Sequence, residues 1–140
     1  MAKNSVKEIY AASAFILDSI GEPYGRVLVV QRPDNETSGK RALCEGVGGK
    51  KNPLSRTTAR DLARECFEEV DLVIPPSAFR FFDEGAYSYQ GGRKIVRVQR
   101  FVSPRPFGQT VKIPERELRH HDRFHWVTAH TYEDHRYVAG

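Results

Sequence analysis

The segment that most restricts the fold runs from Thr57 to Val70, with the sequence TTARDLARECFEEV. Its apolar residues recur with the period of a helix and, at about 100° per residue, fall within one sector of it. They are Ala59, Leu62, Ala63, Cys66 and Val70. The spacing predicts a helix that reaches about Val70 and packs this face against a core. Ser55 or Thr57 can provide its N-cap.

Three glutamates, Glu65, Glu68 and Glu69, share the neighbouring sector of this helix, because positions i, i+3 and i+4 lie on one face. Each like-charge pair costs roughly 0.2–0.5 kcal/mol, and the C-terminal end of a helix disfavours negative charge. Bound magnesium or manganese would offset both costs, since these ions prefer several oxygen ligands. Arg64 could orient one carboxylate. From spacing alone, a solvated acidic stripe balanced by Arg60 and Arg64 is the stronger interpretation.

Strand patterns flank the helix. Strands are expected at Glu8–Leu17, Arg26–Gln31 and Phe124–Thr128, a short extended piece at Ala42–Val47, and a hairpin from Phe79–Tyr89 and Arg93–Val102. The segment Pro104–Arg123 is expected to be irregular, and the tail from Ala129 is weakly patterned. Trp126 and the aromatic residues of the hairpin are expected in the core and in cross-strand pairs, although the hairpin residues could instead stack on a base or an apolar group. This order predicts a mixed sheet with a helix packed on it.

Bulk properties narrow the class of protein. A chain of 140 residues with 39% hydrophobic and 29% charged residues fits one soluble domain, 1–140. The net charge of +4 favours anionic ligands such as phosphates. No block of five or six like charges occurs, which argues against dedicated nucleic-acid binding. No apolar run approaches the ~20 residues of a membrane span, so no membrane association is expected.

The two cysteines, Cys44 and Cys66, have no recognisable metal or redox spacing. We therefore expect both thiols to be reduced and the protein to be cytoplasmic. Cys66 falls on the core face of the helix and should be inert, and Cys44 is expected to behave as a small hydrophobe.

Three motifs, in order, resemble those of the Nudix hydrolase superfamily. Arg64–Leu72, RECFEEVDL, resembles the second half of the Nudix box, R-E-U-x-E-E-x-G-U with U apolar. Cys44–Gly49, CEGVGG, is similar to the W-E-x-P-G-G stretch that often enters this box. Phe124–Thr128, FHWVT, is similar to the F-x-W-V-T that often closes such domains. The resemblance implies a Nudix-type α/β/α sandwich with a mixed β-sheet.

The box is degenerate. In the full pattern, G-x5-E-x7-R-E, the upstream glutamate falls at Arg56, or at Ser55 if the loop carries one inserted residue. The glycine position falls at Lys50, and Asp71 stands where the last glycine of the box is expected. These departures leave the fold expectation intact and the catalytic competence open.

The resemblance implies hydrolysis of a nucleoside diphosphate derivative or related small diphosphate with Mg²⁺ or Mn²⁺. It makes Glu65, Glu68 and Glu69 metal ligands, with the Gly49 carbonyl as a further one. Arg64 would hold the glutamates in place, and Glu68 or Glu69 could instead help to activate water. All four side chains are thus candidate catalytic residues.

Two further groups are candidates beside this site. Lys50, Lys51 and Arg56 could contact substrate phosphate, although solubility alone would explain them. A general base often comes from a late loop, and for any single member of that loop a solvated charge is the simpler interpretation. The candidates there are Glu115, Glu117, His120, His121 and Asp122.

Two alternatives to a hydrolase remain open at this point. The absent upstream glutamate and Asp71 are compatible with a Nudix-like domain that has lost hydrolysis and binds a nucleotide or a protein partner. A third possibility, non-hydrolytic chemistry on a small metabolite, has no residue that argues for it directly. The sequence specifies neither the leaving group nor the oligomeric state.

Overall fold

The computed structural model describes residues 6–18, 25–35, 41–51, 58–89 and 91–138. The strands are β1 (Lys7–Asp18), β2 (Arg26–Gln31), β3 (Cys44–Glu45), β4 (Val47–Lys50), β5 (Arg80–Tyr89), β6 (Lys94–Pro104) and β7 (Arg123–Val127). The helix α1 spans Thr58–Val70, and 3-10 turns occur at η2 (Pro76–Ala78), η3 (Glu115–Glu117) and η4 (Tyr132–Asp134). No helix in these ranges is long and apolar enough to cross a membrane.

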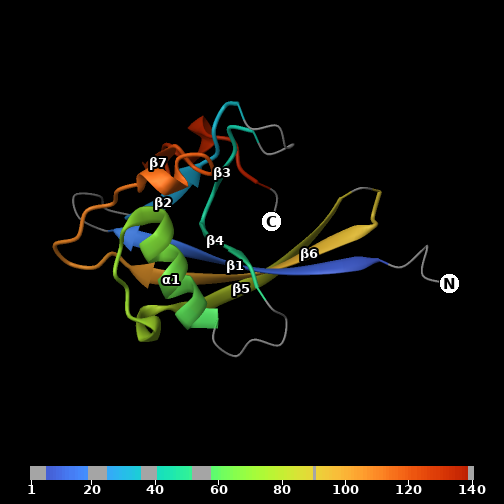
Figure 1. Cartoon of the computed structure of the whole chain (residues 1–140), viewed down its shortest axis with the longest axis horizontal. Coiled ribbons are helices and arrows are strands. Elements are labelled where there is room, and N and C mark those ends of the chain that lie inside the picture. Colours follow the sequence, from blue (N-terminus) through green and yellow to red (C-terminus); the bar gives the residue numbers. More distant parts are fainter. Residues whose placement is uncertain (1–5, 19–24, 36–40, 52–57, 90, 139–140) are drawn as a thin grey trace.

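The strands form one mixed sheet in the order β3-β2-β1-β6-β5, with β4 paired to β1 and β7 paired to β2. Strand β1 runs parallel to β6 and antiparallel to β2 and β4. The strands β1, β5 and β6 form a long ribbon (Figure 1), and α1 packs on the sheet mainly against β4 and β1. The mixed sheet and the packed helix agree with the sequence prediction.

The helix α1 buries the face that its periodicity predicted. Leu62, Cys66 and Val70 are buried, and Ala59 and Ala63 pack against the same core. Burial raises the pKa of the Cys66 thiol to about 12, which agrees with an inert core cysteine. The helix cap predicted at Ser55 or Thr57 lies outside the described residues.

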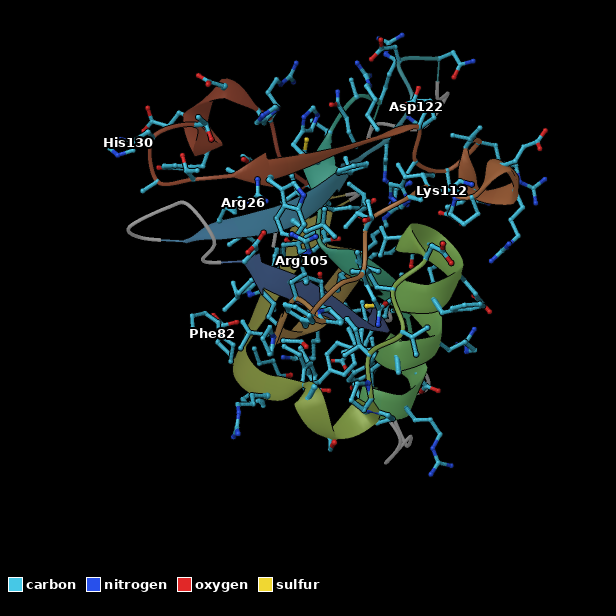
Figure 2. All side chains as sticks on the ribbon, turned by 90° about the vertical axis from the view of Figure 1, so that its left-hand side faces the viewer. Arg26, Phe82, Arg105, Lys112, Asp122 and His130 are labelled. Carbon is cyan, nitrogen blue, oxygen red and sulfur yellow. The ribbon has the colours of Figure 1, made fainter. Side chains whose placement is uncertain are left out.

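Trp126 also packs against this core, as predicted. The guanidinium groups of Arg26 and Arg105 lie over its ring, 4.8 and 5.8 Å from the centroid. Both arginines bind the buried Asp18 carboxylate, with nitrogen–Oδ2 distances of 2.7 and 3.0 Å, and Figure 2 shows them side by side. These contacts fasten β1, β2 and the segment after β6 to one another.

The glycine pair after β3 does not form a turn. Gly48 and Gly49 lie inside β4, where they pair with Ser13 and Ala12 of β1. Gly48 has φ +156°, and a Cβ there would overlap the carbonyl oxygen of Ala12. Glycine is therefore required at this position for β4 to approach β1 closely.

The β5–β6 hairpin is present as predicted, but its aromatic residues are less buried than expected. Phe81 pairs with Phe101, with ring centroids 5.6 Å apart, yet 57% of Phe81 is exposed. The register shifts between Phe81 and Asp83, so Phe82 lies in a bulge and is 67% exposed. Figure 2 shows Phe82 at the edge of the molecule. The bulge interrupts the alternation of inward-facing and outward-facing side chains along β5, from which the burial of these aromatic residues was predicted.

The C-terminal tail pairs with β3 at the edge of the sheet. After η4 it runs beside this strand, where the Cys44 amide donates to the Arg136 carbonyl at 2.7 Å. The Val138 amide donates in turn to the Cys44 carbonyl at 2.9 Å. Below the tail, Val29, Cys44 and Val127 form a small apolar cluster that is separate from the core under α1.

Candidate functional site

The last turn of α1 contains a glutamate whose carboxyl group is buried in the protein. Glu69 is 4% exposed, and its Oε2 has no hydrogen-bond partner among the residues that the structure describes. Burial and the neighbouring Glu65 carboxyl raise the pKa of Glu69 to about 10, and Glu117 and Glu45 act in the same direction. A buried carboxyl surrounded by carboxyls must hold a proton or face a cation.

His121 connects this carboxyl to two others. Its Nδ1 lies 3.0 Å from Glu117 Oε2 and 3.5 Å from Glu69 Oε1. Its Nε2 lies 2.7 Å from Glu45 Oε2. The ring is buried, and both nitrogens face carboxylate oxygens, so an imidazolium ring would donate to both sides. Residues from β3, α1 and the segment around η3 thus meet at one point.

Glu45 is held differently from Glu69. Its Oε2 lies 2.7 Å from Arg32 Nε. Burial acts to raise the pKa of Glu45, but the His121 hydrogen bond and the Arg32 charge outweigh it and hold the pKa below its ordinary value. In the metal-free protein Glu45 is therefore ionised where Glu69 retains its proton.

These side chains fit a divalent cation. Ligand atoms of Glu69, Glu117 and His121 all lie within 4.8 Å of one another. Mg²⁺ and Mn²⁺ prefer carboxylate oxygens, and imidazole is also a common ligand of transition metals. The unpartnered Glu69 oxygen is a ligand atom that the protein leaves unsatisfied.

The structure brings together part of the predicted acidic set. Glu65 hydrogen-bonds with Glu69, and its Oε1 lies 3.8 Å from where a Cβ on Gly49 would be. The Glu68 side chain is 45% exposed, 3.5 Å from Arg64 Nη1. The other Arg64 terminal nitrogen is 3.5 Å from Glu65 Oε1. Glu65, Glu69 and Gly49 therefore gather at one place, whereas Glu68 and Arg64 lie on the surface beside them.

The predicted phosphate-binding residues have different environments. Lys50 ends β4 with an exposed side chain. Lys51 Nζ donates to Thr58 Oγ1 at 2.9 Å and to Gln99 Oε1 at 2.7 Å, so it ties the start of α1 to β6. Arg56 lies outside the described residues, as does Ser55, the other position at which the upstream glutamate is replaced.

A cavity of about 410 Å³ opens beside the carboxyl cluster. Glu45 and His121 line the cavity and are also part of the carboxyl cluster, so the cavity borders this cluster directly. The volume falls within the range of ~300–1,000 Å³ that is typical of small-molecule sites. Its other walls combine apolar, aromatic and basic side chains, among them Ile9, Phe15, Tyr87, Val96, Val98, Tyr137, Arg32, Arg100 and Lys50.

Sequence reasoning missed part of this site. Glu45 was recognised as a motif residue without a role, and Glu117 and His121 were two of five loop candidates. The i, i+4 spacing of Glu117 and His121 was a usable signal, since their side chains contact each other at 3.0 Å. Tyr87 was expected in the core or in a cross-strand pair; it pairs with Val96 across the hairpin and also lines the cavity.

No protein-family model matches the sequence, and no curated protein matches it. Several solved structures are similar to it. The NUDIX domain of Shewanella oneidensis NrtR, complexed with ADP ribose, has TM-score 0.70 and 14% identity over 94% of this chain and 79% of that chain. The MutT protein from Methanosarcina mazei Go1 has TM-score 0.66 and 20% identity over 96% and 86%. The C-terminal domain of mouse MUTYH, in complex with human PCNA, has TM-score 0.67 and 17% identity over 95% and 81%.

The mixed sheet, the acidic helix packed on it and these neighbours define the class of fold to which the chain belongs. The chain has the fold of the Nudix superfamily, the α/β/α sandwich that its motifs predicted.

Proposed function

We propose that the protein is a metal-dependent hydrolase that cleaves a diphosphate linkage in a nucleoside diphosphate derivative or a related small molecule. The observation that carries this proposal is the buried Glu69, whose free oxygen lies among the carboxyls of Glu65, Glu117 and Glu45. A protein gains little stability from such a cluster unless it binds a cation.

Mg²⁺ or Mn²⁺ would be held by Glu65, Glu69 and Glu117, with the Gly49 carbonyl as the further ligand implied by the motif. When bound, the ion would neutralise charge on the diphosphate and lower the pKa of an attacking water. Glu68 remains a proposed ligand or water-activating group from the adjacent surface of α1. The nearby Arg64 would limit the movement of Glu65 and Glu68 through its contacts at 3.5 Å.

His121 is the proposed general base. Histidine exchanges protons near neutral pH, and this ring is fixed between Glu45 on one nitrogen and Glu117 on the other. A proton accepted by His121 would be stabilised by both carboxylates. Arg32 keeps Glu45 ionised and thereby holds the ring in this orientation.

The cavity would take the organic part of the substrate. Phe15, Tyr87 and Tyr137 provide aromatic surfaces for a base or another planar group, and Lys50 can reach the phosphates at its edge. The neighbouring NrtR domain was solved with ADP ribose, which is itself a nucleoside diphosphate derivative. This supports the same class of ligand here.

The test is release of phosphate and nucleotide from a panel of nucleoside triphosphates, nucleotide sugars and dinucleoside polyphosphates with Mg²⁺ or Mn²⁺. We expect turnover of one class, reduced at least ~100-fold by Glu69→Gln. The exposed Glu133→Gln is the matched control and should retain full activity. Silence across the panel, with no divalent ion bound by either form, would overturn the proposal in favour of a domain that only binds a nucleotide or a protein.

A further inference from the structure

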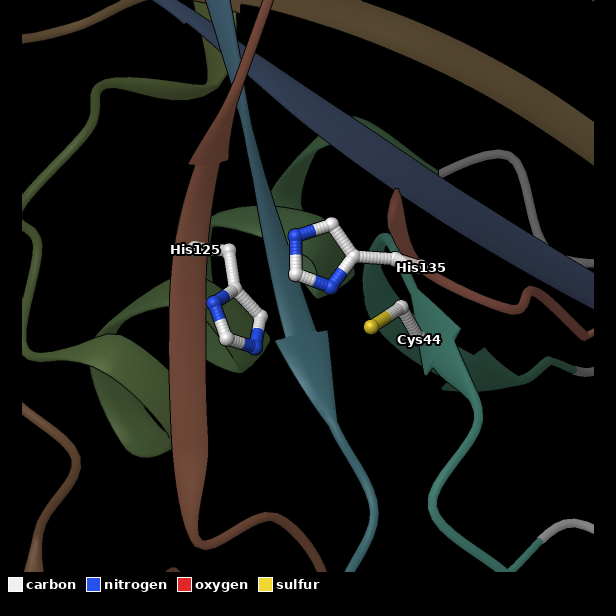
Figure 3. Close-up of side chains that lie close together, drawn as sticks. All are labelled: Cys44, His125 and His135. Atoms are coloured by element: carbon white, nitrogen blue, oxygen red, sulfur yellow. The ribbon is translucent and has the colours of Figure 1, made fainter. Parts of the chain in front are cut away.

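A second group of metal-binding side chains lies near the tail. Cys44 of β3, His125 of β7 and His135 after η4 point into the same space (Figure 3). A ligand atom of each lies within 4.8 Å of the other two. The rings of His125 and His135 face each other with their centroids 4.2 Å apart. Cys44 precedes Glu45 in a strand, so the two side chains point to opposite faces of the sheet.

The sheet register explains how residues so distant in sequence meet. Strand β2 lies between β3 and β7, with Gln31 opposite Cys44 and Val29 opposite His125. Val29 and Gln31 are two residues apart and share a face, so the thiol and the first imidazole project to the same side. The tail then brings His135 above them through its backbone bonds with Cys44.

We propose that Cys44, His125 and His135 form a zinc site. A thiolate and two imidazoles are the donors that Zn²⁺ prefers, whereas Mg²⁺ prefers oxygen. Bond lengths of about 2.0–2.3 Å would set the donors about 3.5 Å apart in a tetrahedral site. The present donor atoms, within 4.8 Å of one another, would have to move closer together to reach this geometry. Binding of the ion would displace the thiol proton.

Gln31 orients part of this group. Its Oε1 accepts a hydrogen bond from His125 Nε2 at 2.6 Å, and its own amide nitrogen donates to the Ala42 carbonyl at 3.1 Å. Hydrogen bonds from outside the ligand set commonly hold metal-binding histidines in position. Because the Gln31 oxygen can only accept, this contact favours the His125 proton on Nε2, and zinc would then bind at Nδ1.

The zinc would fasten the tail to the sheet. The tail has weak apolar anchors, since Tyr132 is 51% and Tyr137 37% exposed. Cys44, Tyr137 and Val138 also line the cavity of about 410 Å³, so the ion would fix one wall of it. The proposed zinc site has no ligand in common with the glutamate cluster, so it does not depend on the proposed hydrolysis.

The test uses the full chain after treatment with a chelator. Zn²⁺ binding is measured by calorimetry, and Co²⁺ is added in parallel because thiolate ligation gives a sulfur-to-cobalt charge-transfer band. We expect a clear band in the wild type, and one equivalent of Zn²⁺ in Glu69→Gln, which lacks a ligand of the glutamate cluster. His135→Gln should weaken Zn²⁺ binding at least about tenfold, and Cys44→Ser should abolish the band.

The matched control is His130→Gln, because His130 belongs to the same segment but is exposed and points outward (Figure 2). It should bind Zn²⁺ like the wild type. Glu69→Gln should keep the cobalt band, which separates this site from the glutamate cluster. A folded wild type without a thiolate band, or His135→Gln with wild-type affinity, would overturn the proposal. His135 is half-buried in the tail, so this variant tests the site even if Cys44→Ser fails to fold.

Discussion

At the scale of single residues, three glutamates on one helix have three different environments. Glu69 is buried, the Glu65 side chain is 23% exposed and the Glu68 side chain is 45% exposed. Helical spacing puts them on one face but does not determine their depth, which depends on the loop that carries Glu117 and His121. The sequence therefore identified Glu65 and Glu69 as candidate metal ligands but could not predict that Glu69 alone is buried.

Replacement of Glu69 by Gln should stabilise the metal-free protein at alkaline pH. Burial and the neighbouring Glu65 carboxyl raise the pKa of Glu69 in the folded protein to about 10, from 4.5 for a free glutamate. When the pKa of a group is higher in the folded protein than in the unfolded chain, the folded protein has its full stability below the unfolded pKa. This stability is lost as the pH rises from the unfolded pKa towards the folded pKa. Glutamine does not titrate, so it avoids this loss. We expect Glu69→Gln to gain at least about 1 kcal/mol over wild type at pH 8 and much less at pH 4.5.

Urea unfolding in a chelator at the two pH values measures this difference. The exposed Glu133→Gln serves as the control and should show no comparable gain. An advantage of Glu69→Gln that is the same at both pH values would mean that the Glu69 carboxyl does not titrate abnormally.

At the scale of elements, periodicity was a good guide to α1 and to the β5–β6 hairpin, because each is specified by its own residues. The glycine pair was less predictable. The sequence predicted an extended piece that ends at Val47, whereas in the structure Gly48 and Gly49 continue as strand β4 against β1. Close approach between strands is a property of two distant segments, so it cannot be determined from one of them.

Gly48→Ala should disrupt the pairing of β4 with β1. Its φ of +156° is unfavourable for alanine, and the new Cβ would overlap the Ala12 carbonyl oxygen. We expect a loss of about 1–3 kcal/mol in the free energy of unfolding. Gly49→Ala is the comparison, because its Cβ would meet nothing closer than Glu65 Oε1 at 3.8 Å. Equal losses for the two variants would contradict the steric explanation.

At the scale of the whole molecule, two groups of metal-binding side chains lie on opposite faces of one sheet. In the first, a local motif identified Glu65 and Glu69, whereas Glu117 and His121 were only two of five loop candidates. The second was not accessible from sequence, because Cys44, His125 and His135 come from three distant segments and show no metal-binding spacing. The expectation that Cys44 is a small hydrophobe describes its contacts with Val29 and Val127 but omits the two histidines.

Because the two sites use different donors, their ions should stabilise the protein independently. Each ion at about 100 times its dissociation constant adds about 2.7 kcal/mol to the free energy of unfolding. We expect the increases in Tm from Mn²⁺ and from Zn²⁺ to add in the wild type. Glu69→Gln should lose only the Mn²⁺ increment, and His135→Gln only the Zn²⁺ increment. Loss of both increments in either variant would show that the two ions share one site.

Strand β3 consists of two residues, Cys44 and Glu45, whose side chains point to opposite faces of the sheet. Cys44 is a ligand of the proposed zinc site, and Glu45 holds His121 beside the glutamate cluster. Displacement of this strand by one residue would exchange the two side chains. The glutamate would then enter the apolar cluster of Val29 and Val127, and the thiol would face His121. A deletion of one residue immediately before Cys44 should therefore abolish both sites together, whereas a deletion of two would preserve the alternation of faces. The register between β2 and β3 thus limits which insertions and deletions the segment before Cys44 can accept.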